Sequence, residues 1–573
     1  MTVAMATTGV ENERPAPRPD PPPHPSQRCF RPLRGGRRVR PQREHHGALS
    51  QPGHEGQGAA SFRFHHRSFG LYFLAENIDA DVTVLDFPSR ERFARELRRG
   101  YDIVGISFIT PNFVKAREMA RLVREISPGT EIVLGGHGAA IEGVEELIEC
   151  DHVVKGEGIR WLRRHLGQNP FAPLVHPSLP STERMSIFGV PLLGNTSSLL
   201  VPGVGCVNGC NFCCTSHYFG LRYTPFLGTG RELFETARRI ADERGTDGFF
   251  VMDENFLKDR ERALALVEEM EREKRFFRFH IFSSAEAITA FGLDNLVRLG
   301  VTMVWIGFES RSRQSAFKKN VGIDGKALVR ELRNRGISVL ASGILCMEHH
   351  TPENMPEDID YLVELEADFV QFMLLIPLPV TKLYREHQHR GLLRDDLPFE
   401  EWHGQKELVS RHPAFSAPEP ERWIEKAFAQ DYSANSSSML RVAETSLRGY
   451  ERLAAMPALD ECLDTRMRNC ERQAREYGLM VPVMARHAVN ELERERARAL
   501  EARLKRAFGP RGMKEMAAIA VLHALTLRWK LRVRLLGDGI QPRTIVTRYP
   551  AGRFEAGLMA EAEPPAPDAV SAA

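Results

Sequence analysis

Three closely spaced cysteines are the residues of this sequence best suited to carry chemistry. The segment VGCVNGCNFCCTS places Cys206, Cys210 and Cys213 four and three residues apart, so one loop can wrap a metal centre. Thiolates at such spacing bind soft metals. Cys214 cannot easily act with the other three, because it directly follows Cys213. The segment therefore predicts a metal centre with three cysteine ligands.

Two kinds of metal centre fit this pattern, and they differ in the fourth ligand. A zinc site takes four Cys or His ligands in a closed tetrahedron, and His217 is the only nearby imidazole. A four-iron four-sulfur cluster held by three cysteines leaves one iron open, so that a small molecule can be activated at the metal. We expect the cluster and keep the zinc site with His217 as the structural alternative.

The cysteine segment follows the first of six predicted strands in a region that alternates strands and amphipathic helices. The predicted strands are Ser198–Val204, Gly248–Met252, Phe277–Ser283, Met303–Phe308, Val339–Leu345 and Phe369–Ile376. The predicted helices between them are Glu232–Arg244, Arg262–Glu273, Leu293–Leu299, Lys326–Arg335 and Glu357–Leu365. Regular βα units predict a partial (β/α)6 TIM-type barrel over 198–425, with its site at the C-terminal ends of the strands. The cysteines stand at such an end.

A second, smaller α/β region precedes the barrel at residues 69–165. Its predicted strands are Val82–Asp86, Ile103–Ser107, Glu131–Leu134 and His152–Val154, with helices at Arg90–Arg99, Val114–Ile126 and Ile141–Glu149. This alternation predicts a flavodoxin-like, Rossmann-like domain. Such a fold needs an earlier strand, and the sequence before Leu71 offers no candidate for it.

The remaining segments differ in composition from these two domains. Residues 1–68 are rich in Pro and Arg and lack apolar periodicity, so we expect a disordered tail. Residues 166–197 form a polar, Pro-containing linker. Residues 426–573 are predicted to be a C-terminal helical region. The fold class is thus α/β with helices at the C-terminal side.

Composition limits the range of functions. At 573 residues the chain is too long for one core. Lysine plus arginine (77) nearly balances aspartate plus glutamate (75), so no overall charge favours a nucleic-acid partner. No stretch reaches the roughly 18 apolar residues of a membrane span, and no signal peptide is visible. Nine scattered cysteines do not form a disulfide framework, and we expect a cytoplasmic protein.

The cysteine pattern resembles the signature of the radical S-adenosylmethionine (SAM) superfamily. Cys206, Cys210 and Cys213 meet its spacing, and Phe212 provides the aromatic residue usual before the third cysteine. The resemblance implies a four-iron four-sulfur cluster whose open iron chelates the amino and carboxylate groups of SAM. One electron from the cluster then cleaves the C5′–S bond and gives a 5′-deoxyadenosyl radical.

Further segments resemble the same superfamily at the predicted strand ends. FFVMDENFLKD ends with Asp253, Glu254 and Asn255, where relatives carry polar residues near the methionine amino group, and VWIGFES ends with Glu309 and Ser310, beside the bound nucleoside. SVLASGILCM is similar to the strand that packs on the adenine, and LLIPLPVTKLY to a segment after the sixth strand. Val380 replaces a usual glycine there. Without the cysteines, these acids would be read as solvated strand-end residues.

The upstream domain resembles the cobalamin-binding module of one radical SAM branch. Ser107 and Ile109 in VGISFIT and the paired Gly135 and Gly136 in IVLGGHG match its motifs, and VVKGEG is similar to its end. The Asp-x-His-x-x-Gly loop of other cobalamin proteins is missing, so no lower axial histidine is assigned. The alternative is a vestigial domain kept for packing.

The resemblance implies an enzyme that uses a cluster, SAM and cobalamin to methylate an unactivated carbon of a lipid or natural-product intermediate. An external one-electron donor such as a flavodoxin or ferredoxin is expected. The enzyme alternative is a radical rearrangement, cyclisation or coupling without methyl transfer. The non-enzyme alternative is an iron–sulfur or zinc redox-sensing module.

A last pattern bears on a peripheral membrane contact and a lipid substrate. Met516–Leu527 is apolar and is followed by the aromatic and basic residues Arg528, Trp529, Lys530, Arg532 and Arg534. Such a helix can lie in a membrane interface. Because its apolar residues run almost all round, we favour a helix packed in the protein core.

Overall fold

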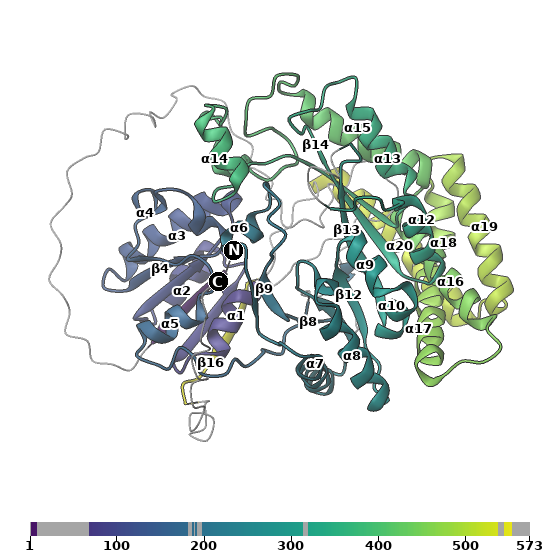
Figure 1. The fold of residues 1–573 in the computed structure, drawn as a ribbon, viewed down its shortest axis with the longest axis horizontal. Helices are drawn as coiled ribbons and strands as arrows, with labels where there is room; N and C mark the ends of the chain where they lie inside the picture. The colour runs from purple at the N-terminus through teal and green to yellow at the C-terminus, as the bar shows by residue number, and fades with distance from the viewer. Residues whose placement is uncertain are drawn as a thin grey trace, which may run out of the picture.

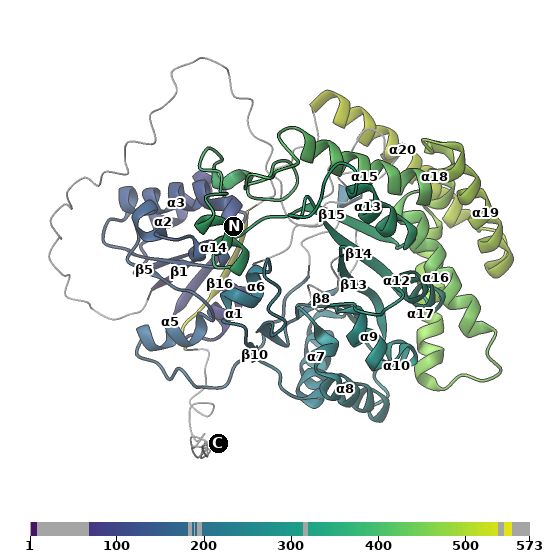
Figure 2. The same cartoon turned by 45° about the horizontal axis from the view of Figure 1, so that its top comes forward.

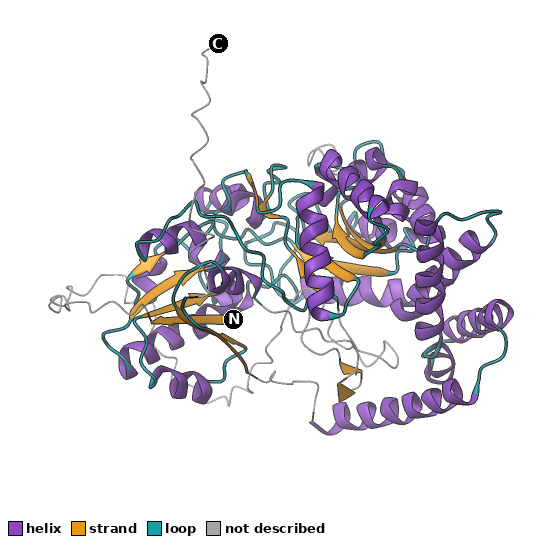
Figure 3. Ribbon diagram, turned by 90° about the horizontal axis from the view of Figure 1, so that it is seen from below, coloured by secondary structure: helices purple, strands orange, loops and turns teal. Residues whose placement is uncertain are grey.

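The computed structural model describes residues 2–7, 68–181, 186–187, 190–191, 197–312, 319–536 and 544–552. Most of its strands form two six-stranded sheets, each flanked by helices (Figures 1 and 3). The α/β class and the order of the two domains predicted from the sequence are confirmed. Most of the predicted disordered tail, residues 8–67, lies outside the described residues.

The N-terminal sheet has the strand order β16-β2-β1-β3-β4-β5. The four strands predicted from the sequence are present as β2 (Asp81–Asp86), β3 (Ile103–Ser107), β4 (Glu131–Gly135) and β5 (His152–Val153). The helices are α1 (Phe69–Glu76), α2 (Arg90–Leu97), α3 (Phe113–Ile126), α4 (Val144–Leu147) and α5 (Ile159–His165). Two apolar clusters pack against its strands, so the sheet is Rossmann-like.

Two strands of this sheet correct the prediction. β1 (Thr2–Thr7) lies between β2 and β3 and is antiparallel to both, so the start of the predicted tail fills the place of the strand that we had found missing. β16 (Ile545–Tyr549) pairs with β2 at the sheet edge, although this segment was predicted to be helical. The two ends of the described chain therefore complete one domain.

The second sheet has six parallel strands in the order β15-β14-β13-β12-β11-β8. They are β8 (Ser198–Leu200), β11 (Gly248–Val251), β12 (Arg278–Phe282), β13 (Val301–Glu309), β14 (Ser338–Leu345) and β15 (Phe369–Leu374). The helices beside them include α7 (Gly230–Arg244), α8 (Arg260–Arg272), α9 (Ala285–Phe291), α10 (Leu293–Leu299), α12 (Gly325–Asn334) and α13 (Met355–Glu364). β8 and β15 are its two edges, as expected for a partial barrel.

Side chains alternate along the barrel strands. In β12, Phe279 and Ile281 are fully buried in the core against the helices, whereas His280 and Phe282 point to the other face and stay half-buried. On that inner face Phe282 stacks on Trp305, with ring centroids 5.1 Å apart. Burial lowers the pKa of His280 to about 4, so this imidazole is neutral near pH 7. The inner face of the barrel is therefore aromatic and uncharged around His280, Phe282 and Trp305.

The C-terminal region consists of helices packed beside the barrel (Figures 1 and 2). They are α15 (Glu419–Asn435), α16 (Ser438–Ala454), α17 (Glu461–Gly478), α18 (Val481–His487), α19 (Glu491–Phe508) and α20 (Met513–Leu536). Among the described residues, no helix is both long and apolar enough to cross a bilayer.

Candidate active site

A short antiparallel ladder closes the base of the cysteine segment. β9 (Gly203–Gly205) pairs with β10 (Tyr223–Pro225), and the cysteines and the short helix α6 (Cys214–Tyr218) lie between these strands. A Cβ atom on Gly203 would lie 2.5 Å from the Thr224 carbonyl oxygen, and one on Gly205 would lie 2.1 Å from that of Arg222. Only glycine fits at these positions, so the ladder fixes where the loop that carries Cys206, Cys210 and Cys213 (the cysteine loop) begins.

The three cysteines that we predicted as ligands are all half-buried, and none of them forms a disulfide. Burial raises the pKa of Cys210 to about 11, against a smaller opposite effect of Lys319. Burial also raises the pKa of Cys213, and Cys206 contributes to the shift of both thiols. Cys206 and Cys213 thus both act electrostatically on Cys210.

The spacing of the ligand atoms argues against a single zinc ion. Thiolates on one tetrahedral zinc lie ~3.8 Å apart, given a Zn–S bond of about 2.3 Å. Within the described part of the chain, the sets of three candidate ligand atoms within 4.8 Å of one another include neither a cysteine nor His217. At least one pair of the three thiols is therefore more than 4.8 Å apart, which is wider than a single zinc ion allows.

Lys319 is a site residue that the sequence analysis missed. Its Nζ lies 2.9 Å from Glu309 Oε1, and the two side chains are only 18% and 10% exposed. Burial alone would lower the pKa of Lys319, but Glu309 and, more weakly, Cys210 raise it overall. A charged ammonium thus lies beside the cysteine loop. Cations in this place favour a negatively charged cluster or a bound carboxylate.

Glu254 faces the cysteine loop from the end of β11. Burial raises the pKa of its carboxyl, whereas a hydrogen bond with the Thr215 hydroxyl and the charge of Lys319 oppose the shift. The residue is nevertheless exposed to solvent. Both observations hold when a side chain is open to water on one side and surrounded by protein on the others. Glu254 is therefore placed to meet a ligand at the open side.

Asp253, predicted beside Glu254 as a SAM ligand, lies in a different environment. Its Oδ2 accepts hydrogen bonds from Tyr223 Oη at 2.7 Å and from Arg262 Nη2 at 2.9 Å. Arg262 Nη1 also donates to Tyr223 Oη, and the Asp253 and Arg262 side chains are almost fully buried. This carboxylate is saturated by protein groups, so we assign it a structural role in joining β11, β10 and α8.

Asn255 and Ser310 also form hydrogen bonds with neighbouring protein groups. Asn255 Oδ1 accepts from the Ser283 hydroxyl and the Ser284 amide, which ties the ends of β11 and β12 together. Ser310 lies next to Ser312 and the buried Asp358, whose Oδ2 contacts His350 Nε2 at 2.9 Å. Phe212 is half-buried within the loop. These residues position the site.

Three strained backbone positions follow the barrel strands. Glu309, Cys346 and Val380 have φ angles of 60°, 54° and 74°, in the left-handed region that L residues avoid. Val380 takes the place of the glycine that is usual in the superfamily segment it resembles, and a positive φ is the conformation that glycine adopts without strain. Strain of this kind collects at functional sites. The segment after Val380 also reaches the cysteine loop, because Leu383 N donates to the Asn211 carbonyl at 3.0 Å.

The cysteine loop is joined directly to the N-terminal domain. Tyr218 Oη donates to the carbonyls of Gly136 (3.0 Å) and Val154 (3.4 Å), which lie in the loops after β4 and β5. The His137 ring packs on Tyr218 with centroids 4.7 Å apart. Burial lowers the pKa of His137 and raises that of Tyr218 to about 12, so both are uncharged near pH 7. The loops after β4 and β5 and the cysteine loop with α6 are therefore in direct contact with one another.

The residues predicted to bind cobalamin lie at the C-terminal ends of β3 and β4. Ser107 and Gly135 are paired in register, and Ile109 is 51% exposed, which is unusual for a large apolar side chain. A Cβ on Gly135 would meet no atom within 4 Å, whereas one on Gly136 (φ 76°) would lie 2.7 Å from the Phe108 carbonyl oxygen. Open space and an exposed apolar residue at this edge suit a large, flat, apolar ring.

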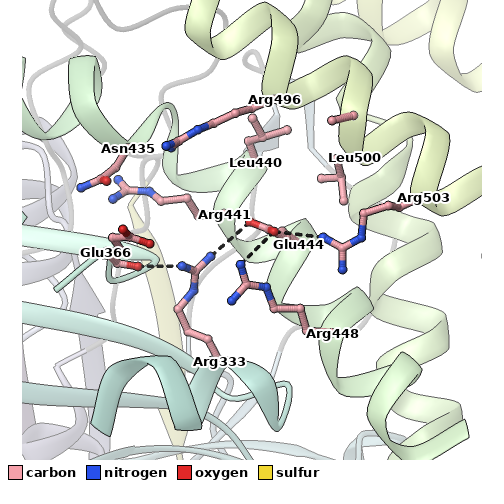
Figure 4. Close-up of a pocket in the computed structure, with 11 residues that line it drawn as sticks. Arg333, Glu366, Asn435, Leu440, Arg441, Glu444, Arg448, Arg496, Leu500 and Arg503 are labelled. Carbon is pink, nitrogen blue, oxygen red and sulfur yellow. Dashed lines mark hydrogen bonds and ion pairs between the residues drawn. The ribbon is translucent and has the colours of Figure 1, made fainter. Parts of the chain in front are cut away.

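A cavity of about 230 Å³ lies elsewhere, among the C-terminal helices (Figure 4). Three arginines, Arg333, Arg448 and Arg503, converge on Glu444. Burial would raise the pKa of Glu444, but these three cations hold it below its usual value. Among the described residues, neither a cysteine nor a predicted SAM ligand lines this cavity. Its ion pairs join α12, α16 and α19, and we assign them a structural role.

Two family models match the chain. The B12 binding domain matches residues 58–163, and the Radical SAM superfamily matches residues 200–362. The first covers the sheet that carries Ser107 and Gly135, and the second covers the cysteine loop and the barrel up to α13. Both predicted families are thereby confirmed.

Several curated proteins are similar to this chain at low identity. An uncharacterized methyltransferase of Pyrococcus horikoshii is 22% identical over 355 residues, which is 55% of this chain and 77% of that protein. The bacteriochlorophyllide d C-12(1)-methyltransferase of Chlorobaculum tepidum is 24% identical, with 54% and 71% covered. The anaerobic magnesium-protoporphyrin IX monomethyl ester cyclase of Cereibacter sphaeroides is 21% identical, with 52% and 56% covered.

Among solved structures, the radical SAM methyltransferase TsrM of Kitasatospora setae, with cobalamin and a [4Fe-4S] cluster bound, aligns with a TM-score of 0.46 and 17% identity. The alignment covers 67% of this chain and 90% of that one. The chain thus combines a region that matches the B12 binding domain with a following region that matches the radical SAM superfamily, which is the pair of domains predicted from the sequence.

Proposed function

We propose that the enzyme is a cobalamin-dependent methyltransferase that methylates an unactivated carbon of a small-molecule, lipid or natural-product intermediate. The observation that carries the proposal is the contact made by Tyr218, five residues after Cys213, with Gly136 and Val154 of the B12-binding domain. This contact holds the cysteine loop, which we propose carries the cluster, against the loops after β4 and β5, where we propose that cobalamin binds. Methyl transfer requires such proximity of the two cofactors.

When bound, the cluster supplies the electron that cleaves SAM, and cobalamin supplies the methyl group. Cys206, Cys210 and Cys213 are the proposed cluster ligands. Glu254 and the Glu309–Lys319 pair have the charges to bind the ammonium and carboxylate of SAM. The neutral aromatic inner face, with Phe282 and Trp305, would exclude water from the substrate carbon.

A radical rearrangement or cyclisation without methyl transfer is the second candidate, favoured by the similarity to a cyclase of Cereibacter sphaeroides. In both cases we propose an external flavodoxin or ferredoxin as the one-electron donor. A non-catalytic sensor would not cleave SAM.

The test uses anaerobically reconstituted protein supplied with hydroxocobalamin, a reductant and SAM carrying a CD3 group. We expect about four irons and one cobalt per chain, formation of 5′-deoxyadenosine, and CD3 transfer to cobalamin detected by mass spectrometry. Cleavage of SAM with cobalamin bound but never methylated would select the second candidate. Absence of SAM cleavage would contradict both enzyme functions.

Replacing Gly135 tests the proposed cobalamin site without disturbing the strands that form it. The Gly135 Cβ direction is open, so Gly135→Leu should fold, and its side chain should obstruct the bound ring. Because overpacking costs ~1–3 kcal/mol, we expect the Kd for cobalamin to rise roughly 10- to 100-fold. Gly129→Leu is the matched control, because Gly129 also has no neighbour within 4 Å but precedes β4 at the opposite edge. Equal cobalamin binding by both variants, measured by absorbance titration, would rule this site out.

A further inference from the structure

Helix α20 presents a large apolar surface to solvent. Six large apolar side chains on it are between 57% and 91% exposed. They are Met513, Met516, Val521, Leu527, Leu531 and Leu535. The helix lies at the outer edge of the C-terminal helices (Figure 2). Large apolar side chains concentrated in this way on one helix mark an interaction site more often than a plain surface.

The opposite face of α20 packs against the other C-terminal helices. Trp529 is buried in the cluster formed with α16 to α19, and Leu522 and Leu525 pack against it. Ile519 is also buried. The core-packed helix favoured from the sequence is therefore half correct, because only one face is buried. Trp529 is 9% exposed and so belongs to the buried face.

The exposed apolar residues form one continuous stripe. Met516, Ala520, Ala524, Leu527, Leu531 and Leu535 follow one another at intervals of four, four, three, four and four residues, and all are exposed. Such intervals keep side chains on one side of a helix. The stripe therefore offers a straight apolar edge along most of α20.

The charges beside this stripe are all of one sign. Arg528, Lys530 and Arg534 are exposed near its C-terminal end, and no Asp or Glu occurs from Met516 to Leu536. A second copy of the chain would bring the same positive charges to the contact, which disfavours self-association. An anionic surface would complement them. Long basic side chains can cover apolar surface while their charges reach headgroups.

We infer that the exposed face of α20 docks on the surface of an anionic lipid bilayer. The helix would lie in the plane of the interface, with the leucine and methionine side chains among the acyl chains and the basic residues at the headgroups. The inference goes beyond the proposed function, since docking requires neither cofactor and says nothing of the methyl acceptor.

The test is co-sedimentation of the full-length protein with vesicles of phosphatidylglycerol and phosphatidylcholine, or of phosphatidylcholine alone, at low and high salt. We expect binding to the anionic vesicles that weakens as salt is raised, and little binding to the neutral ones. Leu527→Glu with Leu531→Glu alters two exposed positions, so it should abolish binding and leave the fold intact, as checked by thermal melting. Failure of the wild-type protein to sediment with anionic vesicles at low salt would overturn the inference.

Matched charge variants separate docking from a general effect of net charge. Replacing Arg528, Lys530 and Arg534 by Gln should lower the partition coefficient roughly 100-fold, at about 1 kcal/mol per cation near the surface. The control replaces Arg498, Lys505 and Arg506, three exposed cations of the neighbouring α19, by Gln and should bind nearly as the wild type does. Equal losses in both triple variants would contradict docking through α20. So would a wild-type dimer that becomes monomeric in the Leu527→Glu, Leu531→Glu variant, because it would make a second copy the occupant of this face.

Discussion

Replacing Cys206, Cys210 or Cys213 by alanine is expected to abolish both the cluster and the cleavage of SAM. Each thiol is one of three proposed ligands on a short loop fixed by the β9–β10 ladder. With one ligand removed, two thiolates remain to hold four irons. We expect iron content near zero after desalting and 5′-deoxyadenosine formation reduced by at least about 1000-fold, which corresponds to roughly 4 kcal/mol.

Cys214 provides the control for this prediction because it lies in the same segment. Burial raises the pKa of Cys214 as it does those of Cys210 and Cys213, so the pKa does not distinguish it from the proposed ligands. Its position does, because Cys214 directly follows Cys213 and begins the helix α6. Cys214→Ala should retain the absorption of the cluster and SAM cleavage within about twofold of wild type. A Cys214 variant without the cluster, together with a Cys213 variant that keeps it, would show that the ligands are assigned wrongly.

The strands of the barrel could be predicted from the sequence because buried parallel strands are short, continuous apolar runs. The predicted Val339–Leu345 and Glu131–Leu134 each differ from the observed strands by one residue at one end. β1 and β16 could not be found in this way. Each is a short segment beside unrelated sequence, and each gains its partner only when β2, distant along the chain, lies next to it.

The side on which a strand-end residue points could not be predicted either. Asp253 and Glu254 are adjacent acids, and both were predicted to face SAM. The structure turns Asp253 toward Arg262 and Tyr223 and leaves Glu254 at the cysteine loop. Lys319 was missed because nothing in its local sequence marks it. Only the fold brings it to Glu309.

Replacing Lys319 is expected to have the second largest effect on SAM cleavage. Lys319→Met leaves Glu309 buried without its partner, and breaking a buried ion pair costs about 3–5 kcal/mol of folding free energy. If the ammonium also binds the carboxylate of SAM, its loss should lower SAM cleavage by at least about 100-fold, or roughly 2.7 kcal/mol. Iron content should stay near four per chain, because Lys319 is not a ligand.

The double variant Lys319→Met, Glu309→Gln separates the structural from the functional contribution. Removing both charges eliminates the unpaired buried carboxylate, so much of the lost stability should return, measured as the free energy of unfolding in urea. SAM cleavage should not return, because neither charge is then available to the ligand. Recovery of both stability and cleavage would mean that the pair is only structural.

The Asp253–Arg262 pair supplies the comparison that makes this result interpretable. It is also a buried ion pair on a barrel strand end, but its members hydrogen-bond to each other and to Tyr223. Arg262→Met should therefore destabilise the fold about as much as Lys319→Met does. Among folded molecules, measured at low temperature, the affinity for SAM should remain within about threefold of wild type. A fall in SAM affinity as large as that of Lys319→Met would show that any broken charge pair near the loop disturbs the site, and that Lys319 has no special role in binding.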